Sequence, residues 1–149
     1  MKHLFFVLLF ALICNISAQD AYIEMLRSDI RAKKVAIMTQ SMNFSEEQAK
    51  VFWPIYREYN TEQEKISDER IKLIKSYIKF YENMTDKTAK VLMNKSLEID
   101  QARLDLRKKY YKKLEKALPA QLAAKAMQLD NQINMLIRIQ IDSELPLLK

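Results

Sequence analysis

The side chains that most often perform chemistry in proteins are nearly missing from this sequence. It contains one histidine and one cysteine, His3 and Cys14, and both lie within the first 18 residues. The rest of the chain offers no thiol nucleophile, no imidazole base and no Ser-His-Asp arrangement. Zinc and copper sites normally need cysteine or histidine, so these metals are disfavoured as well.

Glycine is absent, which excludes a second group of chemistries. Phosphate-cradling loops and dinucleotide fingerprints need glycine for close approach of the backbone to the ligand. Acidic neighbours such as Asp68 and Glu69 lie in lysine-rich helical stretches, where nothing indicates the desolvated cleft that would shift their pKa values. We therefore expect no catalytic site, no metal and no cofactor, and we predict that the protein is not an enzyme.

The first residues have the order of a secretory signal peptide. Lys2 and His3 precede an apolar run at 4–13, and the small-residue pattern at 16–18 suits cleavage after Ala18. The run is shorter than the ~20 residues that a membrane span needs. Of the 25 lysines and arginines only Lys2 would be removed, so against 19 acidic residues the exported chain has a net charge of +5. In an exported protein this charge favours acidic protein, glycan or lipid surfaces as partners, and not nucleic acid.

The remaining residues, 19–149, are expected to form a single helical domain. The spacing of apolar residues predicts four helices, at about 20–40, 46–83, 86–118 and 119–143. The second carries a heptad-like seam with alternating spacings of four and three, and Pro54 lies inside it. This seam comprises Phe52, Tyr56, Tyr59, Gln63, Ile66, Arg70, Leu73, Tyr77 and Phe80. The predicted fold is all-α: about four antiparallel helices dominated by a long helical hairpin, elongated and dimeric.

A short motif marks the start of the second helix. Phe44, Ser45 and Gln48 match the three defining positions of the LTxxQ motif, and Leu118 and Gln121 resemble a second copy that is one residue short and lacks the threonine. With the segment 52–56 and the tail 128–132, the chain resembles the Spy/CpxP-like periplasmic proteins over most of its length after the signal peptide. Ser45 and Gln48 also have the spacing of a helix capping box, the interpretation that we favour over contact with a partner. We extend the same capping interpretation to Gln121 at the start of the last helix.

The resemblance implies a small, ATP-independent periplasmic chaperone or envelope-stress sensor, built from helical hairpins that pair into a cradle. Some members bind metals through histidine or cysteine, which this chain lacks after residue 18. A metal-sensing role is therefore not implied here.

Two groups of residues are candidates for partner binding. The first is a basic stretch with five cations in seven residues: Arg107, Lys108, Lys109, Lys112 and Lys113. The second is an aromatic group that includes Phe52, Trp53 and Tyr56. Each has a simpler structural interpretation, a solvated helix face for the first and core packing for the second. Because Phe52 and Trp53 are adjacent, they cannot share one narrow helix face, so one of them is expected at the surface or in a dimer interface.

The leading functional hypothesis is reversible capture of unfolded or membrane-associated envelope proteins on the open face of the hairpin. The alternative is a signalling regulator that binds the periplasmic domain of a sensor kinase or an anti-sigma system. A third possibility is a purely structural envelope protein without a client. A homodimer is expected.

Overall fold

The computed structural model describes residues 32–143 and 145–147, and every element in them is helical. The chain divides into two compact units, Met1–Ser41 and Met42–Lys149. In the first unit the described residues are helical, and this helix runs over 32–42. Asn43 then has a φ of 48°, a left-handed conformation that asparagine tolerates and that commonly follows the end of a helix. The predicted signal peptide and the first part of the predicted first helix lie outside the described residues.

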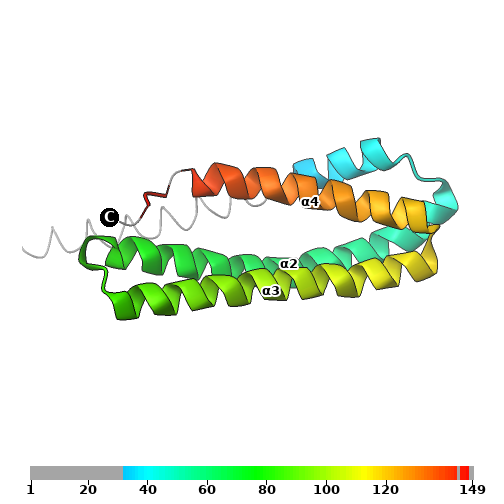
Figure 1. Ribbon diagram of the computed structural model, residues 1–149. Coiled ribbons are helices and arrows are strands. Elements are labelled where there is room, and N and C mark those ends of the chain that lie inside the picture. Colours follow the sequence, from blue (N-terminus) through cyan, green and yellow to red (C-terminus); the bar gives the residue numbers. More distant parts are fainter. Residues whose placement is uncertain (1–31, 144, 148–149) are drawn as a thin grey trace, which may run out of the picture. The chain divides into compact units, whose positions relative to one another are not determined.

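The second unit contains three long helices (Figure 1). They are α2 (Glu46–Phe80), α3 (Asp86–Ala117) and α4 (Ala120–Asp142), and the single turn η1 (Tyr81–Asn83) follows α2. The predicted all-helical fold with a dominant hairpin is confirmed, and the predicted helix bounds agree with the structure to within three residues. No strand occurs in the part of the chain that the structure describes.

Local sequence explains where these helices begin and end. Thr85 caps α3, because its side chain accepts a hydrogen bond from the backbone N–H of Thr88. Pro119 separates α3 from α4 because proline cannot continue the α3 hydrogen-bond ladder, yet its φ of −53° suits the start of a helix. Pro54 lies inside α2, which continues through it despite the loss of one backbone donor.

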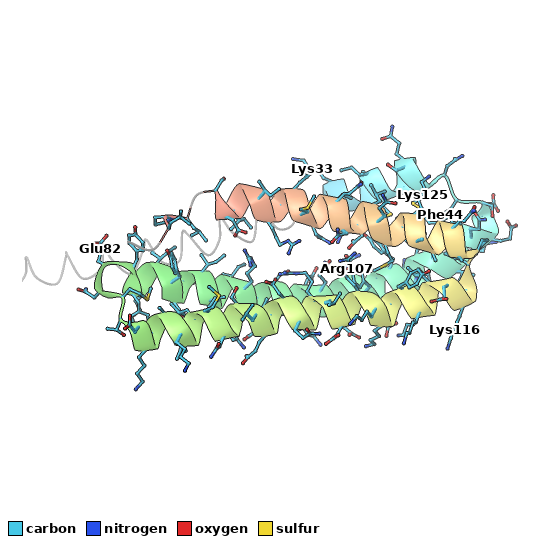
Figure 2. The ribbon with its side chains drawn as sticks, viewed as in Figure 1. Lys33, Phe44, Glu82, Arg107, Lys116 and Lys125 are labelled. Carbon is cyan, nitrogen blue, oxygen red and sulfur yellow. The ribbon has the colours of Figure 1, made fainter. Side chains whose placement is uncertain are left out.

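Short connections make α3 antiparallel to both α2 and α4, and α3 packs against each of them. The α2–α3 turn is at one end of the second unit, near Glu82, and the α3–α4 turn is at the other, near Phe44 (Figure 2). The buried side chains of α2, α3 and α4 and of the α3–α4 turn gather toward the Phe44 end, in the first half of α2, from the middle of α3 onward and in the first half of α4. They are Phe52, Tyr56, Tyr59, Ile99, Leu106, Tyr110, Leu114, Leu118, Ala123, Ala126, Met127 and Asp130.

The segment after α4 returns to the end of α2. The hydroxyls of Tyr77 and Tyr81 donate hydrogen bonds to the backbone carbonyls of Pro146 and Leu147. These contacts hold the described part of the C-terminal segment against the hairpin. The Leu147 side chain itself remains exposed.

Candidate functional site

The motif at the start of α2 forms a complete capping box. The Gln48 backbone N–H donates to Ser45 Oγ at 3.3 Å, and the Ser45 backbone N–H donates to Gln48 Oε1 at 3.0 Å. Each side chain thus satisfies a backbone donor that the helix start would leave open. Phe44 packs on Phe52, with ring centroids 4.5 Å apart. The structural interpretation of this motif is confirmed.

The second motif-like segment, at Leu118 and Gln121, does not form a capping box. Leu118 is buried, and its backbone N–H closes the last turn of α3 by donating to the Leu114 carbonyl at 2.9 Å. The residue that precedes α4 is Pro119, and no side chain caps this helix. The expected capping role of Gln121 is therefore wrong. The physical reason is that Pro119 occupies the capping position and has no hydroxyl, and Gln121 is exposed.

The aromatic group forms a continuous row in the core. Phe52 stacks on Tyr56 at 5.0 Å between ring centroids, Tyr56 lies 6.1 Å from Tyr59, and Tyr59 lies 5.3 Å from Tyr110 of α3. Phe52 and Tyr56 are buried, so in this structure they pack the interior and do not face a partner. Trp53 is partly exposed and meets Phe52 edge-on at 5.1 Å. As expected for adjacent residues, one of the pair is inside and the other reaches the surface.

A buried carboxylate accepts hydrogen bonds at the centre of the second unit, and it was not predicted from the sequence. Asp130 of α4 is 0% exposed. Its two oxygens accept hydrogen bonds from the Tyr56 hydroxyl at 2.9 Å, the Tyr59 hydroxyl at 2.8 Å and the Asn134 amide at 2.7 Å. Its burial could have been inferred from its position in the sequence. Asp130 lies four residues after Ala126 and three before Ile133, so it shares the apolar face of α4.

Burial and this carboxylate change the chemistry of the two tyrosines. Desolvation raises the pKa of Tyr56 and of Tyr59 far above the ordinary value, and the negative charge of Asp130 raises both further. The phenols therefore remain protonated hydrogen-bond donors at every physiological pH. They act as a link between α2 and α4 and not as acids or bases.

The basic stretch of α3 divides into inward and outward parts. Lys109 Nζ contacts Glu62 at 2.8 Å and Lys113 Nζ contacts Glu58 at 2.8 Å, both across the α2–α3 interface. The Tyr110 hydroxyl also donates to Glu62, at 2.7 Å. Both ammonium groups lie over the Tyr110 ring, within 5.1 Å of its centroid. These two lysines therefore join the helices of the hairpin.

The remaining cations of this stretch differ from that pair. Lys108 is exposed and lies 3.6 Å from Asp105 on its own helix, and Lys112 is also exposed. Arg107 lies between α3 and α4, and its Nε atom is buried (Figure 2). The five cations therefore do not form one continuous surface. Lys108 and Lys112, continued by the outward-pointing Lys116, form what we call the outer basic row.

Two sets of apolar side chains remain exposed on the second unit. The α3 apolar row consists of Met93, Leu97 and Leu104, whose spacings of four and seven place them on one helix face. The α4 apolar patch consists of Met135, Leu136 and Ile139. Leu97 is 60% exposed and Leu136 is 66% exposed. Groups of exposed apolar side chains of this kind mark interaction surfaces more often than isolated ones do.

The described residues contain no group of three histidine, cysteine, aspartate or glutamate side chains arranged to hold a metal ion. None of the helices described is both long enough and apolar enough to cross a bilayer.

No protein-family model, no curated protein and no solved structure matches this chain.

Proposed function

We propose that this protein is a periplasmic, ATP-independent chaperone-like protein that binds partially unfolded or membrane-associated envelope proteins. The observation that carries this proposal is the solvent exposure of the α3 apolar row and the α4 apolar patch. These side chains supply non-directional contacts, which suit clients of varied sequence. Methionines at positions 93 and 135 add adaptable side chains to both surfaces.

The number of exposed side chains suits weak, reversible binding. Burying one leucine, isoleucine or methionine side chain stabilises a complex by roughly 1.5–3 kcal/mol. Three such residues on one surface yield roughly 5–9 kcal/mol, which is comparable with the estimated ~4–15 kcal/mol cost of association. A client would therefore be held transiently and released without an energy source.

The outer basic row assists encounter in this proposal. Lys108 follows Leu104 by one helical turn and shares its face, so a positive charge lies next to exposed apolar surface. Positive charge raises the rate at which acidic partners arrive, and the effect weakens as salt increases. Lys109 and Lys113 contribute less to steering, because Glu62 and Glu58 offset their charges.

The resemblance to Spy/CpxP-like proteins supports the same function through the motif at Phe44, Ser45 and Gln48. It adds the proposals that the chain is exported, with cleavage near Ala18, and that two copies pair into a cradle. Sedimentation analysis of the purified protein tests the pairing, since a homodimer has twice the mass of the single chain.

An aggregation assay with matched variants tests the chaperone proposal. Light scattering would follow a model protein that aggregates, with this protein in several-fold molar excess. Leu97→Gln with Leu104→Gln, or Leu136→Gln with Ile139→Gln, is expected to weaken suppression of aggregation. Glutamine keeps good helix propensity, so the change is mainly in surface polarity.

The control removes two exposed apolar side chains that lie outside both surfaces. Val51 of α2 and Val91 of α3 are 40% and 60% exposed, so Val51→Gln with Val91→Gln is the matched double variant. This variant is expected to suppress aggregation as well as the wild type does. Wild-type protein that leaves aggregation unchanged at every ratio would rule out the chaperone proposal.

The alternative proposal is a regulator of a sensor kinase or an anti-sigma system. Such a regulator would bind one folded periplasmic domain saturably and would ignore denatured clients. Titration against both kinds of partner distinguishes the two proposals.

A further inference from the structure

Four partly buried arginines belong to α2, α3 and α4, and together we call them the arginine layer. Arg70 belongs to α2, Arg103 and Arg107 lie one turn apart on α3, and Arg138 belongs to α4. The side chains of Arg70 and Arg103 are 18% and 12% exposed, and Arg107 and Arg138 are also partly buried. Burial and the positive charges of Arg138 and Arg70 lower the pKa of Arg103. Arg70 of α2 also contacts Asp142 of α4, which lies one helical turn beyond Arg138.

Three of the four arginines have an unused donor in the interior. The Nε atoms of Arg70, Arg107 and Arg138 are buried, and none has a hydrogen-bond partner within the described residues. One such atom comes from each of the three helices. A guanidinium group has only donors, and buried donors in folded proteins are nearly always paired. Among the described residues, these three donors therefore lack an acceptor.

Carboxylates accompany two of the four arginines. Arg70 pairs with Asp142 at the end of α4, and Arg103 Nη1 pairs with Asp100 Oδ1 at 2.6 Å. Both aspartates are about half exposed, so they lie toward the outside of the layer.

The other two arginines have no such partner in the part of the chain that the structure describes. Arg107 and Arg138 form no ion pair with any residue that the structure describes. The nearby carboxylate of Asp130 already accepts three hydrogen bonds from neutral donors. With four guanidinium groups and the three carboxylates named here, the layer retains an excess of positive charge.

We infer that this arginine cluster, formed by Arg70, Arg103, Arg107 and Arg138, binds a phosphate-class oxyanion between the three helices. Donors that come from three helices suit a tetrahedral anion with several acceptor oxygens better than a planar carboxylate, which one arginine fork can satisfy. The negative charge of such an anion offsets the excess positive charge of the layer. Inorganic phosphate and the phosphate of a lipid headgroup share this chemistry.

Bound oxyanion would connect α4 to the α2–α3 hairpin at the level where the apolar core ends. An anion that binds only the folded state raises the melting temperature as its concentration increases. This effect is independent of the exposed apolar surfaces, so it can be tested apart from chaperone activity.

The experiment measures the melting temperature and the calorimetric dissociation constant of the purified protein with sodium phosphate, against sodium chloride at equal ionic strength. Phosphate is expected to raise the melting temperature beyond the effect of chloride. Arg107→Gln and Arg138→Gln are each expected to weaken phosphate binding about tenfold or more, since each removes charge-assisted hydrogen bonds. Arg138→Lys retains the charge without the guanidinium fork and provides a milder variant if Arg138→Gln does not fold.

The controls are Lys108→Gln and Lys112→Gln, which each remove one positive charge from the exposed side of the same helix. Both are expected to bind phosphate as the wild type does. Co-sedimentation with phosphatidylglycerol vesicles identifies the lipid source if binding there also depends on Arg107 and Arg138. The inference is overturned if neither phosphate nor these vesicles bind, or if the lysine variants lose as much affinity as the arginine variants.

Discussion

The hydroxyl of Tyr59 on α2 donates a hydrogen bond of 2.8 Å to the carboxylate of Asp130 on α4, across 71 residues of sequence. Tyr56 makes the equivalent contact with the other carboxylate oxygen at 2.9 Å. One buried carboxylate thus links α4 to two successive turns of α2. The described backbones of α2 and α4 do not pack closely against each other, so long side chains make the connection between these two helices.

Removing this acceptor should destabilise the protein strongly. Asp130→Ala removes the acceptor to which two buried phenols donate, and each buried donor that loses its acceptor costs about 1–3 kcal/mol. We expect the free energy of unfolding, measured by chemical denaturation, to fall by about 2–5 kcal/mol. Tyr59→Phe, which removes one donor only, should cost less.

The control for these substitutions is Tyr111→Phe, because Tyr111 lies on α3, is only partly buried and is not one of the three residues that donate to Asp130. Its effect should stay within about 0.5 kcal/mol, as is usual for surface positions. Equal losses in Tyr59→Phe and Tyr111→Phe would contradict a special role for the Asp130 contact.

The capping box predicts a difference between the two motif-like segments. Ser45→Ala should lower the free energy of unfolding by about 0.5–2 kcal/mol, because a backbone donor at the start of α2 loses its acceptor. Gln121→Ala should have almost no effect, because no side chain caps α4. Thermal denaturation of both variants checks the prediction, and a large loss in Gln121→Ala would show a role that the structure does not contain.

The ion pairs across the hairpin predict a loss of stability in acid. Hydrogen bonds from Lys113 and Lys109 hold the pKa values of Glu58 and Glu62 below the ordinary value of 4.5. The unfolded chain therefore takes up protons at a higher pH than the folded protein does. Their contribution is fully present above about pH 4.5 and is lost as the pH falls through the lowered pKa values.

Unfolding measured between pH 7 and pH 3 tests this prediction. The double variant Glu58→Gln with Glu62→Gln should lose less stability over the acid range than the wild type does. An unchanged pH profile would mean that these carboxylates titrate alike in the folded and unfolded states. Glu47 and Glu69, whose pKa values are also lowered, would account for the loss that remains.

The two lysine pairs of α3 should respond differently to substitution. Lys109→Gln with Lys113→Gln removes contacts to Glu62 and Glu58, so it should lower stability modestly. Lys108→Gln with Lys112→Gln removes exposed charge, so it should leave stability unchanged and slow association with an acidic client. Each double variant loses two positive charges, so each serves as the control for the other.

Stopped-flow association rates at low and moderate ionic strength provide the measurement. The wild-type rate should fall with salt, and the rate of the Lys108→Gln with Lys112→Gln variant should fall less. Identical rates and salt slopes in all three proteins would remove charge steering from the proposed mechanism.

Much of the fold could be predicted from the sequence because it depends on local interactions. The capping residues Ser45 and Thr85 and the break at Pro119 act on backbone groups a few residues away, so their effect is visible in a single segment. The heptad-like seam of α2 identified Phe52, Tyr56 and Tyr59 as one face of a helix, and all three are buried. Helix type, helix bounds and the hairpin follow from such patterns.

The partners of the charged side chains were decided only by the tertiary structure. In the sequence Lys108 and Lys109 are equivalent neighbours, yet Lys109 contacts Glu62 across the hairpin and Lys108 faces solvent. Asp130 resembles other aspartates until α2 brings two tyrosines to it. Successive residues on a helix point about 100° apart, so the neighbouring helices determine which of them pair, which are buried and which remain exposed.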